Sequence, residues 1–566
     1  MTKFKDMQYT RPDFAAYMTK FKGYLQELKN AQDKETFFKA LLAIDALSRN
    51  LSTLYTLVSI RNSINTKDTF YEAEMDVMDE NMPQFSEIGS TMAQICLDSP
   101  FRKDLAERFG AHLLEKYEIR AKIFKPEIVE DMIEENKLVT EYEKLLASAE
   151  IEFQGKTYNL SGMMPFMQNT DRSIRKAASD ASWGWMASQQ DKLDELFDKL
   201  VKVRCRIAKK LGFANFIELA YARMTRTDWD YKAARVYRKQ IADSVVPLAQ
   251  KLYKEQAARL GIKDMKNYDY SLNFLSGNPK PVGEEAELVA QAKIMYEELS
   301  PQTGEFFNLM INQELMDLTT KPGKRGGGYM TFLPDYKVPF IFSNFNGTSG
   351  DVDVLTHEAG HAFQGYTNRD PELSDTADYT MEVAEIHSMS MEFFTHPWMQ
   401  RFFDKDTEKY YYSHVVDALQ FLPYGASIDE LQEWFYLNPD ATPEQRRAAY
   451  REIEKKYLPH LDYDGNEYLE KGGRWQKQAH VYAMPFYYLD YTLAQVCAFQ
   501  YFIWDMKNHE EAWKSYMHIC KRAGQIPFTA LLKECGLDNP FEDGCIAKIT
   551  PKLEQYLDSL DKSQIH

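Results

Sequence analysis

The run His-Glu-Ala-Gly-His at residues 357–361 constrains the fold of this chain more than any other feature. Its two histidines are four residues apart, so in an α-helix they lie about 40° apart on one face and one turn along the axis. Such a pair can bind zinc, and Glu358 projects beside it, where a general base for a zinc-bound water is needed. The pattern predicts a helix with His357 and His361 as metal ligands. The alternative, an ordinary helix with two packed histidines, stays open at this point.

The composition is that of a globular protein without a nucleic-acid or membrane partner. Hydrophobic residues make up 44% and charged residues 27% of the 566 residues, and the formal charge is −17. An acidic balance disfavours binding to phosphate backbones. The chain contains no apolar run of membrane-spanning length and no secretory signal at its N-terminus. Its six cysteines form no C-x-x-C pair, which favours reduced thiols and a cytoplasmic location.

The spacing of apolar residues predicts a mainly α-helical chain. Helical periodicity runs almost unbroken from Asp13 to Glu150. It is interrupted at 151–160, where Gln154-Gly155 predicts a short hairpin, and it then resumes over 171–261 and 284–317. We therefore predict an N-terminal helical lobe over residues 1–165 and a catalytic domain over residues 166–566.

A small β-hairpin is predicted directly before the histidine helix. Tyr329–Leu333 and Val338–Phe345 are separated by a Pro-Asp turn, and Ser349 or Asp351 can cap the helix that follows. Two interpretations of Val338–Phe345 remain. It either offers an exposed edge to which a peptide substrate adds as a strand, or it only closes a cleft.

A catalytic zinc site needs a third protein ligand and one open position. Gln364 and Thr367 occupy the places where a metzincin would have glycine and histidine, so that class is excluded. A second helix downstream carries three candidates within a sector of about 80°, because their helical spacing brings them to one side. These candidates are Glu382, Glu385 and Glu392. His387 points from the opposite side and is expected to be a packed or surface histidine.

Three stretches resemble the M3 family of zinc oligopeptidases, in particular its oligoendopeptidase F and Pz-peptidase branch. They are Gly347–His361, the helix with Glu385, Ser388 and Glu392, and the tyrosine-rich segment 480–491. The resemblance implies one zinc ion per chain with Glu385 as its third ligand; Glu382 is the fallback.

The same resemblance implies donors for the oxyanion that forms when a peptide carbonyl is attacked. These are His480, Tyr488 and Tyr491, with Tyr487 as a competitor for one tyrosine role. Without the metal motif, the run Tyr-Tyr-x-x-Tyr would be read as core packing. In the implied reaction, Glu358 accepts a proton from the attacking water and passes it to the leaving amine.

The sequence thus predicts a zinc metalloendopeptidase with a two-lobed helical body around a deep cleft, which cuts internal bonds of short peptides. The restriction to short peptides is implied by the family. Two other functions remain: a peptide-binding protein with a structural metal, and a zinc hydrolase of a different amide or ester. The sequence predicts no oligomeric state.

Overall fold

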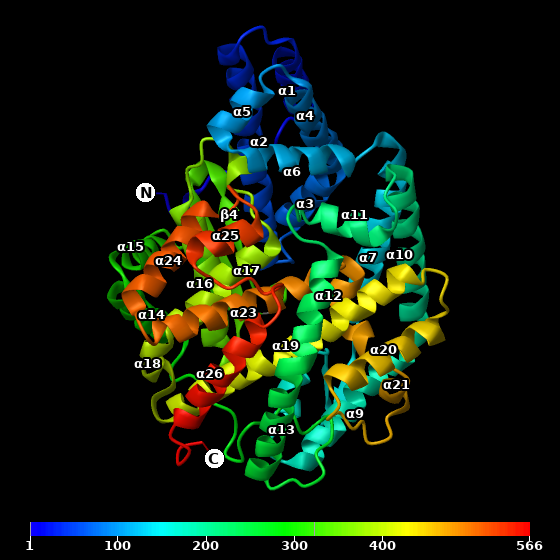
Figure 1. The fold of residues 1–566 in the computed structure, drawn as a ribbon, viewed down its shortest axis with the longest axis vertical. Coiled ribbons are helices and arrows are strands. Elements are labelled where there is room, and N and C mark those ends of the chain that lie inside the picture. The colour runs from blue at the N-terminus through cyan, green and yellow to red at the C-terminus, as the bar shows by residue number, and fades with distance from the viewer. Residues whose placement is uncertain (1, 322, 566) are drawn as a thin grey trace. The chain divides into compact units, whose positions relative to one another are not determined.

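The structure is a computed structural model that describes residues 2–321 and 323–565. It divides into two compact units, each assembled from three stretches of chain. Unit 1 contains residues 1–124, 280–405 and 500–537, and unit 2 contains residues 125–279, 406–499 and 538–566. Helices dominate both units (Figure 1), which confirms the prediction of a mainly α-helical chain with only small sheets. The proposed domain boundary near residue 165 stays a prediction.

Unit 1 contains the N-terminal helices and the histidine helix. Its helices are α1 (Phe14–Asn30), α2 (Lys34–Ile64), α3 (Thr69–Asn81), α4 (Ser86–Asp98), α5 (Arg102–Phe109), α6 (Ala111–Lys122), α14 (Glu285–Leu299), α15 (Pro301–Asn312), α16 (Gly350–Thr367), α17 (Met381–Phe394), α18 (Gln400–Phe403), α24 (His509–Arg522) and α25 (Phe528–Cys535). Aspartates begin the first two, because the Asp13 and Asp33 carboxylates accept backbone N–H groups of Ala16 and Thr36 at 3.0 and 2.8 Å.

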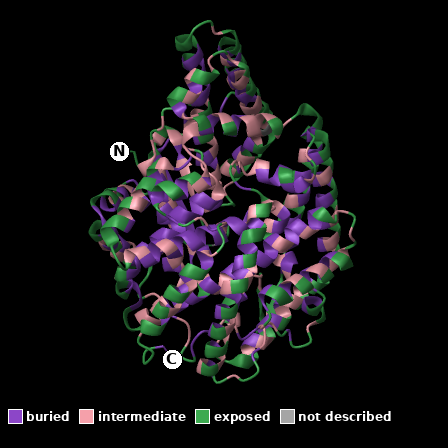
Figure 2. Ribbon diagram, viewed as in Figure 1, coloured by how far each residue is buried: buried purple, intermediate pink, exposed green. Residues whose placement is uncertain are grey.

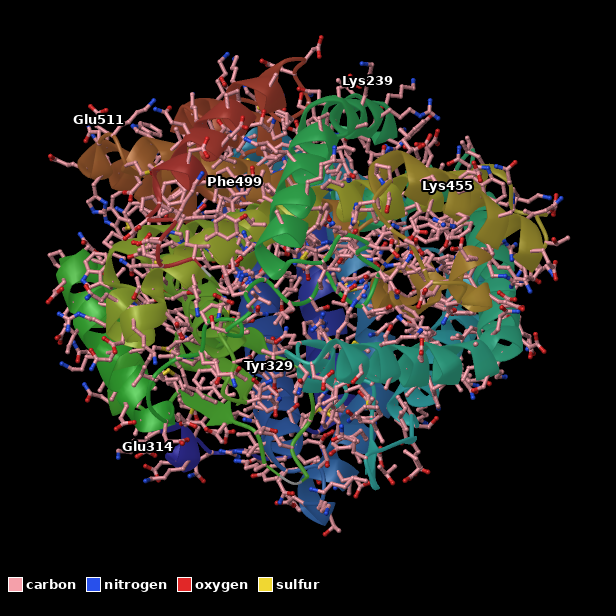
Figure 3. The ribbon with its side chains drawn as sticks, turned by 90° about the horizontal axis from the view of Figure 1, so that it is seen from below. Lys239, Glu314, Tyr329, Lys455, Phe499 and Glu511 are labelled. Atoms are coloured by element: carbon pink, nitrogen blue, oxygen red, sulfur yellow. The ribbon has the colours of Figure 1, made fainter. Side chains whose placement is uncertain are left out.

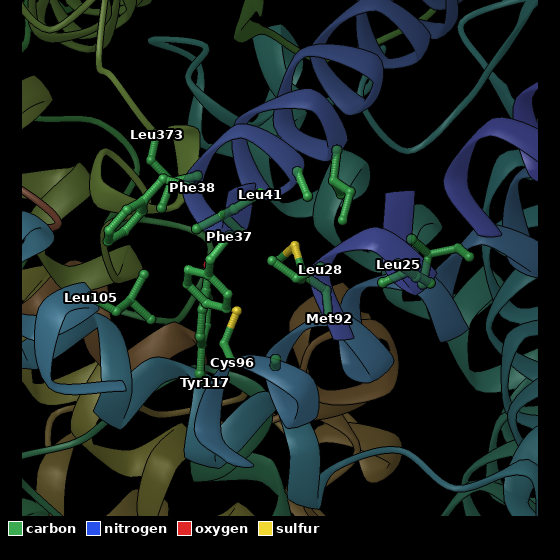
Figure 4. Packing of buried hydrophobic residues seen from close by; sticks show 14 of the residues in the cluster. Leu25, Leu28, Phe37, Phe38, Leu41, Met92, Cys96, Leu105, Tyr117 and Leu373 are labelled. Atoms are coloured by element: carbon green, nitrogen blue, oxygen red, sulfur yellow. The ribbon is translucent and has the colours of Figure 1, made fainter. Parts of the chain in front are cut away.

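The N-terminal helices of unit 1 form a hydrophobic core that also includes a residue from far along the chain. Phe37, Leu41 and Tyr117 are fully buried there, together with Cys96. Leu373, from the segment between α16 and α17, packs into the same cluster (Figure 4). Buried residues likewise occupy the inner faces of these helices, while exposed residues cover their outer faces (Figure 2). The N-terminal helices therefore help to fix the segment that joins α16 to α17.

Polar contacts fix the same segment. The Arg120 guanidinium donates to both carboxylate oxygens of Asp375, at 2.8 and 3.1 Å. The buried Lys116 ammonium donates to the backbone carbonyls of Asp375, Asp378 and Gly524, the last two at 2.9 and 3.0 Å. Burial lowers the pKa of Lys116. Charge-assisted hydrogen bonds of this kind hold a loop firmly, because removing either partner leaves a buried polar group without a hydrogen bond.

The sheet beside α16 has three strands in the order β3-β5-β4. β4 (Tyr329–Leu333) and β5 (Val338–Phe345) form the predicted antiparallel hairpin, and β3 (Met316–Thr319) pairs with β5 in parallel. Of the two interpretations of Val338–Phe345, the exposed edge is wrong, because β5 is the central strand and is paired on both sides. β3, whose first two residues fall in the predicted helical stretch 284–317, forms one edge of the sheet, and β4 forms the other.

Unit 2 is also mainly helical. Its helices are α7 (Val129–Ala147), α8 (Met164–Met167), α9 (Arg172–Ser188), α10 (Gln190–Leu211), α11 (Phe216–Arg223), α12 (Tyr231–Gln240), α13 (Val246–Leu260), α19 (Thr407–Leu437), α20 (Pro443–Tyr457), α21 (Glu467–Glu470), α22 (Ala479–Ala483) and α26 (Cys545–Ser559), and α23 (Tyr488–Asp505) begins in it and ends in unit 1. The predicted hairpin is confirmed as β1 (Ile151–Phe153) and β2 (Lys156–Tyr158).

Many charged side chains are exposed to solvent. Lys239, Lys455 and Glu511, which are labelled in Figure 3, are examples. In the part of the chain that the structure describes, no helix has the length and apolar character needed to cross a bilayer.

Candidate metal centre

Two helices of unit 1 meet at a glycine and bring the predicted metal ligands together. A Cβ atom at Gly360 would lie 2.6 Å from the carbonyl oxygen of His387 and 2.7 Å from the Cα atom of Ser388. Only glycine allows α16 and α17 to approach this closely. The small residue inside the His-Glu-Ala-Gly-His motif therefore sets the distance between the histidines on α16 and the carboxylates on α17.

His357, His361 and Glu385 each point one ligating atom at a common position. The three atoms lie within 4.8 Å of one another. Glu385 Oε2 lies 3.3 Å from His357 Nε2 and 3.5 Å from His361 Nε2. In a tetrahedral zinc site with bonds of about 2.1 Å, two ligand atoms are separated by about 3.4 Å. The donor set and its spacing therefore fit a zinc ion with one position left for water or substrate.

The ligands are themselves oriented by neighbours on α17. His357 Nδ1 lies 2.6 Å from Glu392 Oε1, so that Nδ1 carries the proton and Nε2 is free to bind a metal. The Ser388 hydroxyl donates to Glu385 Oε2 at 3.0 Å and to the Glu385 carbonyl at 3.1 Å. Glu392, a candidate ligand from spacing alone, is thus placed as the partner of His357. The same turn of helix supplies both Glu385 and the hydroxyl that orients it.

The other candidates on α17 lie outside this group. Glu382 is fully buried but contributes no atom to the cluster. His387 is also fully buried, and its ring stands nearly perpendicular to that of Tyr379, with the ring centroids 5.2 Å apart. Of the two roles expected for His387, the structure places it as a packed histidine.

Glu358 lies beside the metal group and against the edge strand β4. Only 8% of the residue is exposed, and burial raises the pKa of its carboxyl. The backbone N–H of Met330 donates to the Glu358 carboxylate. Its Oε2 atom is buried without a hydrogen-bond partner among the described residues. A buried carboxylate with one oxygen uncommitted is well suited to take a proton from a neighbouring group.

The start of α16 differs from the expected cap. The helix begins at Gly350, and the Ser349 side chain makes no capping hydrogen bond. The Asp351 carboxylate instead accepts the backbone N–H groups of Asn346 and Gly347, at 2.9 and 2.8 Å. Asp351 therefore organises the turn that precedes the helix.

The predicted oxyanion donors form a second group, in unit 2. The ring of His480 lies 5.1 Å from that of Tyr488 and 5.7 Å from that of Tyr491, centroid to centroid. Tyr487 belongs to the same group, at 5.5 Å from His480 and 4.8 Å from Tyr491. These distances do not separate Tyr487 from Tyr488. The Gln478 side chain lies 2.8 Å from His480 Nδ1 and fixes the orientation of the imidazole.

Sequence reasoning missed the residues that anchor this tyrosine segment. Phe486 has a φ of 69°, a conformation that large side chains rarely adopt. Its carbonyl accepts a hydrogen bond from the buried Arg226 at 2.9 Å, and its N–H donates to Gln432 at 2.8 Å. Arg226 also pairs with Asp490 at 2.5 Å. No sequence pattern marks these partners, because they lie far apart in the chain.

Sequence comparison gives matches along most of the chain. Residues 4–124 match the peptidase M3 N-terminal domain, and residues 165–550 match peptidase family M3. Oligopeptidase PepF of Bacillus subtilis is 21% identical over 591 aligned residues, which cover 96% of this chain and 83% of that protein.

Solved structures show the same similarity. Pz peptidase A, solved with an inhibitor, is 47% identical and has a TM-score of 0.94, covering 99% of this chain and 100% of its own. The oligoendopeptidase F of Enterococcus faecium is 15% identical with a TM-score of 0.66, covering 98% of each chain, and shares the fold.

Proposed function

Since the chain belongs to peptidase family M3 and is a metallopeptidase of its oligoendopeptidase F and Pz-peptidase branch, we propose that it is a zinc-dependent endopeptidase that cuts internal bonds of short peptides. The observation that carries this proposal is the set of three ligating atoms within 4.8 Å, with the buried Glu358 beside them. The assigned ligands are His357, His361 and Glu385.

The residues divide the work of hydrolysis among them. When bound, zinc acts as a Lewis acid that polarises a peptide carbonyl and makes water more acidic. Glu358 takes the proton of the attacking water on its carboxylate and delivers it to the leaving amine. Burial raises the pKa of the Glu358 carboxyl, which makes its carboxylate a stronger base toward the attacking water.

His480, Tyr488 and Tyr491 are proposed as donors to the oxyanion that forms on the substrate carbonyl. Their mutual ring distances and the hydrogen bond between Gln478 and His480 support this role. Donors fixed before the reaction stabilise developing charge without reorganising during it. Burial holds the pKa of Tyr488 well above its usual range, so its hydroxyl stays protonated and able to donate.

The edge strand β4 supports a way to hold the peptide. β4 pairs with β5 on one side only, and its Met330 N–H points to Glu358. A substrate backbone that pairs along the outer edge of β4 would therefore run past the proton-accepting carboxylate. Hydrogen bonds to the peptide backbone do not depend on the side chains of the substrate, which suits a peptidase that accepts many sequences.

The proposal is tested by measuring metal content and peptide hydrolysis in one preparation. The purified protein is assayed for bound zinc, and cleavage of a mixed peptide library is followed by mass spectrometry with and without a chelator. We expect about one zinc per chain and chelator-sensitive internal cuts in short peptides. Zinc binding without any cleavage would contradict the proposal.

A single substitution tests the role of Glu358 as the base without removing a metal ligand. Glu358→Gln keeps the shape of the side chain but cannot accept a proton, so zinc should stay bound while turnover falls by about a thousandfold or more. Near-normal hydrolysis by this variant would exclude Glu358 as the base.

A further inference from the structure

Unit 1 contains a pocket of about 270 Å³ next to the metal helix. One wall is the edge strand β4, through Met330 and Phe332, and another is the last turn of α16, through Gln364 and Gly365. Arg369 lines the pocket from just beyond the end of the helix. The segment that joins α16 to α17 completes it. The pocket thus combines an apolar floor with polar groups, as sites for small ligands or single side chains commonly do.

The pocket continues the face of α16 that carries the metal ligands. Gly365 follows His361 by four residues in the same helix, so it lies about 6 Å further along the helix axis. Met330 connects the two places, because its backbone N–H donates to Glu358 while its side chain lines the pocket. An extended peptide covers this distance with about two residues.

Arg369 brings to the pocket a positive charge that forms no ion pair among the described residues, and the neighbouring Asp370 pairs with Lys337 at 2.8 Å. Its guanidinium donates to the Tyr366 carbonyl at 2.7 Å and lies over the Tyr366 ring at 3.9 Å. Within the described residues, no carboxylate lies within 4.0 Å of it. Arg49, the other arginine in the lining, is by contrast paired with Asp45 at 2.5 Å and donates to Ser374 Oγ at 2.8 Å.

A second donor in the lining lacks an acceptor. Asn368 Nδ2 is buried and has no hydrogen-bond partner among the described residues. The one acidic side chain in the lining, Asp378, lies 3.8 Å from the Arg120 guanidinium, which also binds Asp375. The groups left unsatisfied are therefore donors and a cation, and the chemistry that satisfies both is a carboxylate.

We propose that this pocket is a substrate subsite that binds a carboxylate of the peptide, about two or more residues from the bond that is cut. The carboxylate comes either from an acidic side chain or from the C-terminus of the peptide. The inference rests on the proposed peptidase function and deepens it. It adds a preference for a peptide carboxylate to a site where the substrate is otherwise held through its backbone.

The first test uses the unaltered protein and matched peptides. Starting from one peptide that is cut at a single bond, glutamate replaces glutamine at each of four positions on either side, and each peptide is made with a free and with an amidated C-terminus. We expect kcat/KM to rise by about tenfold or more for a carboxylate at one position. A gain from glutamate identifies an acidic side chain, and a gain from the free C-terminus identifies the terminal carboxylate.

The second test asks whether Arg369 causes the preference. In Arg369→Gln the ratio of kcat/KM for the charged and neutral peptides should fall to within about threefold of one, and in Arg369→Glu a lysine peptide should become preferred. The ratio is taken within each variant, so a change in overall activity cancels. Arg401→Gln serves as control, because Arg401 pairs with Glu298 elsewhere in unit 1.

Two results would overturn the inference: equal rates for all charged and neutral peptides in the unaltered protein, or an unchanged preference in Arg369→Gln. Both leave the proposed function standing, since the peptides are still cut. Failure to cut any peptide would instead contradict the proposed function itself.

Discussion

At the scale of single residues, the three carboxylates on α17 have separate tasks. Glu385 points its Oε2 atom at both histidines, Glu392 holds His357 Nδ1, and Glu382 takes part in neither contact. Helical spacing puts all three in one sector, so spacing alone could not separate them, and only the family resemblance favoured Glu385. The direction in which each side chain leaves the helix decides the assignment, and that direction depends on the packing of α17 against α16.

A pair of substitutions tests this division. Glu385→Gln removes a charged ligand, and we expect the variant to lose stoichiometric zinc at micromolar concentration. Glu392→Gln leaves three ligands but weakens the orientation of His357, so zinc affinity should fall by about 10- to 100-fold. Competition with a chromogenic chelator measures both affinities. Loss of zinc in Glu382→Ala but not in Glu385→Gln would show that the assignment is wrong.

The tyrosine roles can be separated by removing single hydroxyl groups. Tyr488→Phe and Tyr491→Phe should each lower kcat by about 10²- to 10³-fold with little change in KM, because an oxyanion donor acts only in the transition state. Tyr487→Phe should stay within about threefold of the unaltered protein. Steady-state kinetics on one peptide give all three values, and a larger effect for Tyr487 than for Tyr488 would exchange their roles.

At the scale of elements, the contact between α16 and α17 positions the whole metal centre. Gly360→Ala places a methyl group 2.6 Å from the His387 carbonyl oxygen, so the helices must separate. We expect a loss of about 3 kcal/mol or more in the free energy of unfolding, together with weaker zinc binding. Denaturant unfolding and chelator competition measure the two effects.

The matched control is Gly184→Ala in α9. A Cβ atom there would meet no atom within 4 Å, and the position is exposed. Alanine should therefore stabilise the protein slightly, by up to about 1 kcal/mol, through helix propensity alone. If both variants behaved alike, the close approach at Gly360 would not be what holds the helices.

The elements differ in how well the sequence predicts them. Residues 357–361 carry their own helical spacing, and the hairpin 329–345 carries a local turn, so both follow from neighbouring residues. β3 is four residues long and lies at the end of a helical pattern, and its pairing with β5 is not local. The edge of the sheet was assigned wrongly for the same reason: strand order depends on segments that no local pattern connects. The Arg226 contact with Phe486 is equally non-local.

At the scale of the whole molecule, metal binding should stabilise unit 1 by linkage. The ligands join two helices, and any ion that binds only the folded chain raises its free energy of unfolding. A chelator should therefore lower the melting temperature of the unaltered protein and of Glu358→Gln, but not of Glu385→Gln. Hydrogen exchange should show the loss of protection in α16 and α17 rather than in α10. Equal loss throughout the chain would contradict a local role.

Acid should destabilise unit 2 through His460. Burial, with a smaller contribution from Arg474, lowers the pKa of this imidazole to about 3, and its ring stacks on Tyr253 at 3.7 Å. Since the unfolded chain binds the proton at about pH 6.5, stability is full above that value and falls as the pH drops toward 3, by about 2 kcal/mol at pH 5.

Replacing the imidazole should remove this loss. His460→Gln stays neutral at every pH, so its urea midpoint should change less between pH 7.5 and pH 5 than that of the unaltered protein. His518→Gln is the control, because His518 is 45% exposed and pairs with Glu534 at the surface. An acid response of His460→Gln equal to that of the control would contradict the assignment.

Unit 1 is assembled from three stretches that lie far apart in the chain, and this has a consequence for synthesis on the ribosome. The three ligands are complete once residue 385 has been added, but the helix that packs behind them is α24, at 509–522. Its Tyr516 hydroxyl donates to the His387 carbonyl at 2.8 Å, and the Lys116 ammonium needs the carbonyl of Gly524. A growing chain that already carries every ligand therefore cannot yet fix them. Metal binding that needs fixed ligands should therefore begin only after α24 has been synthesised, well after the last proposed ligand has been added.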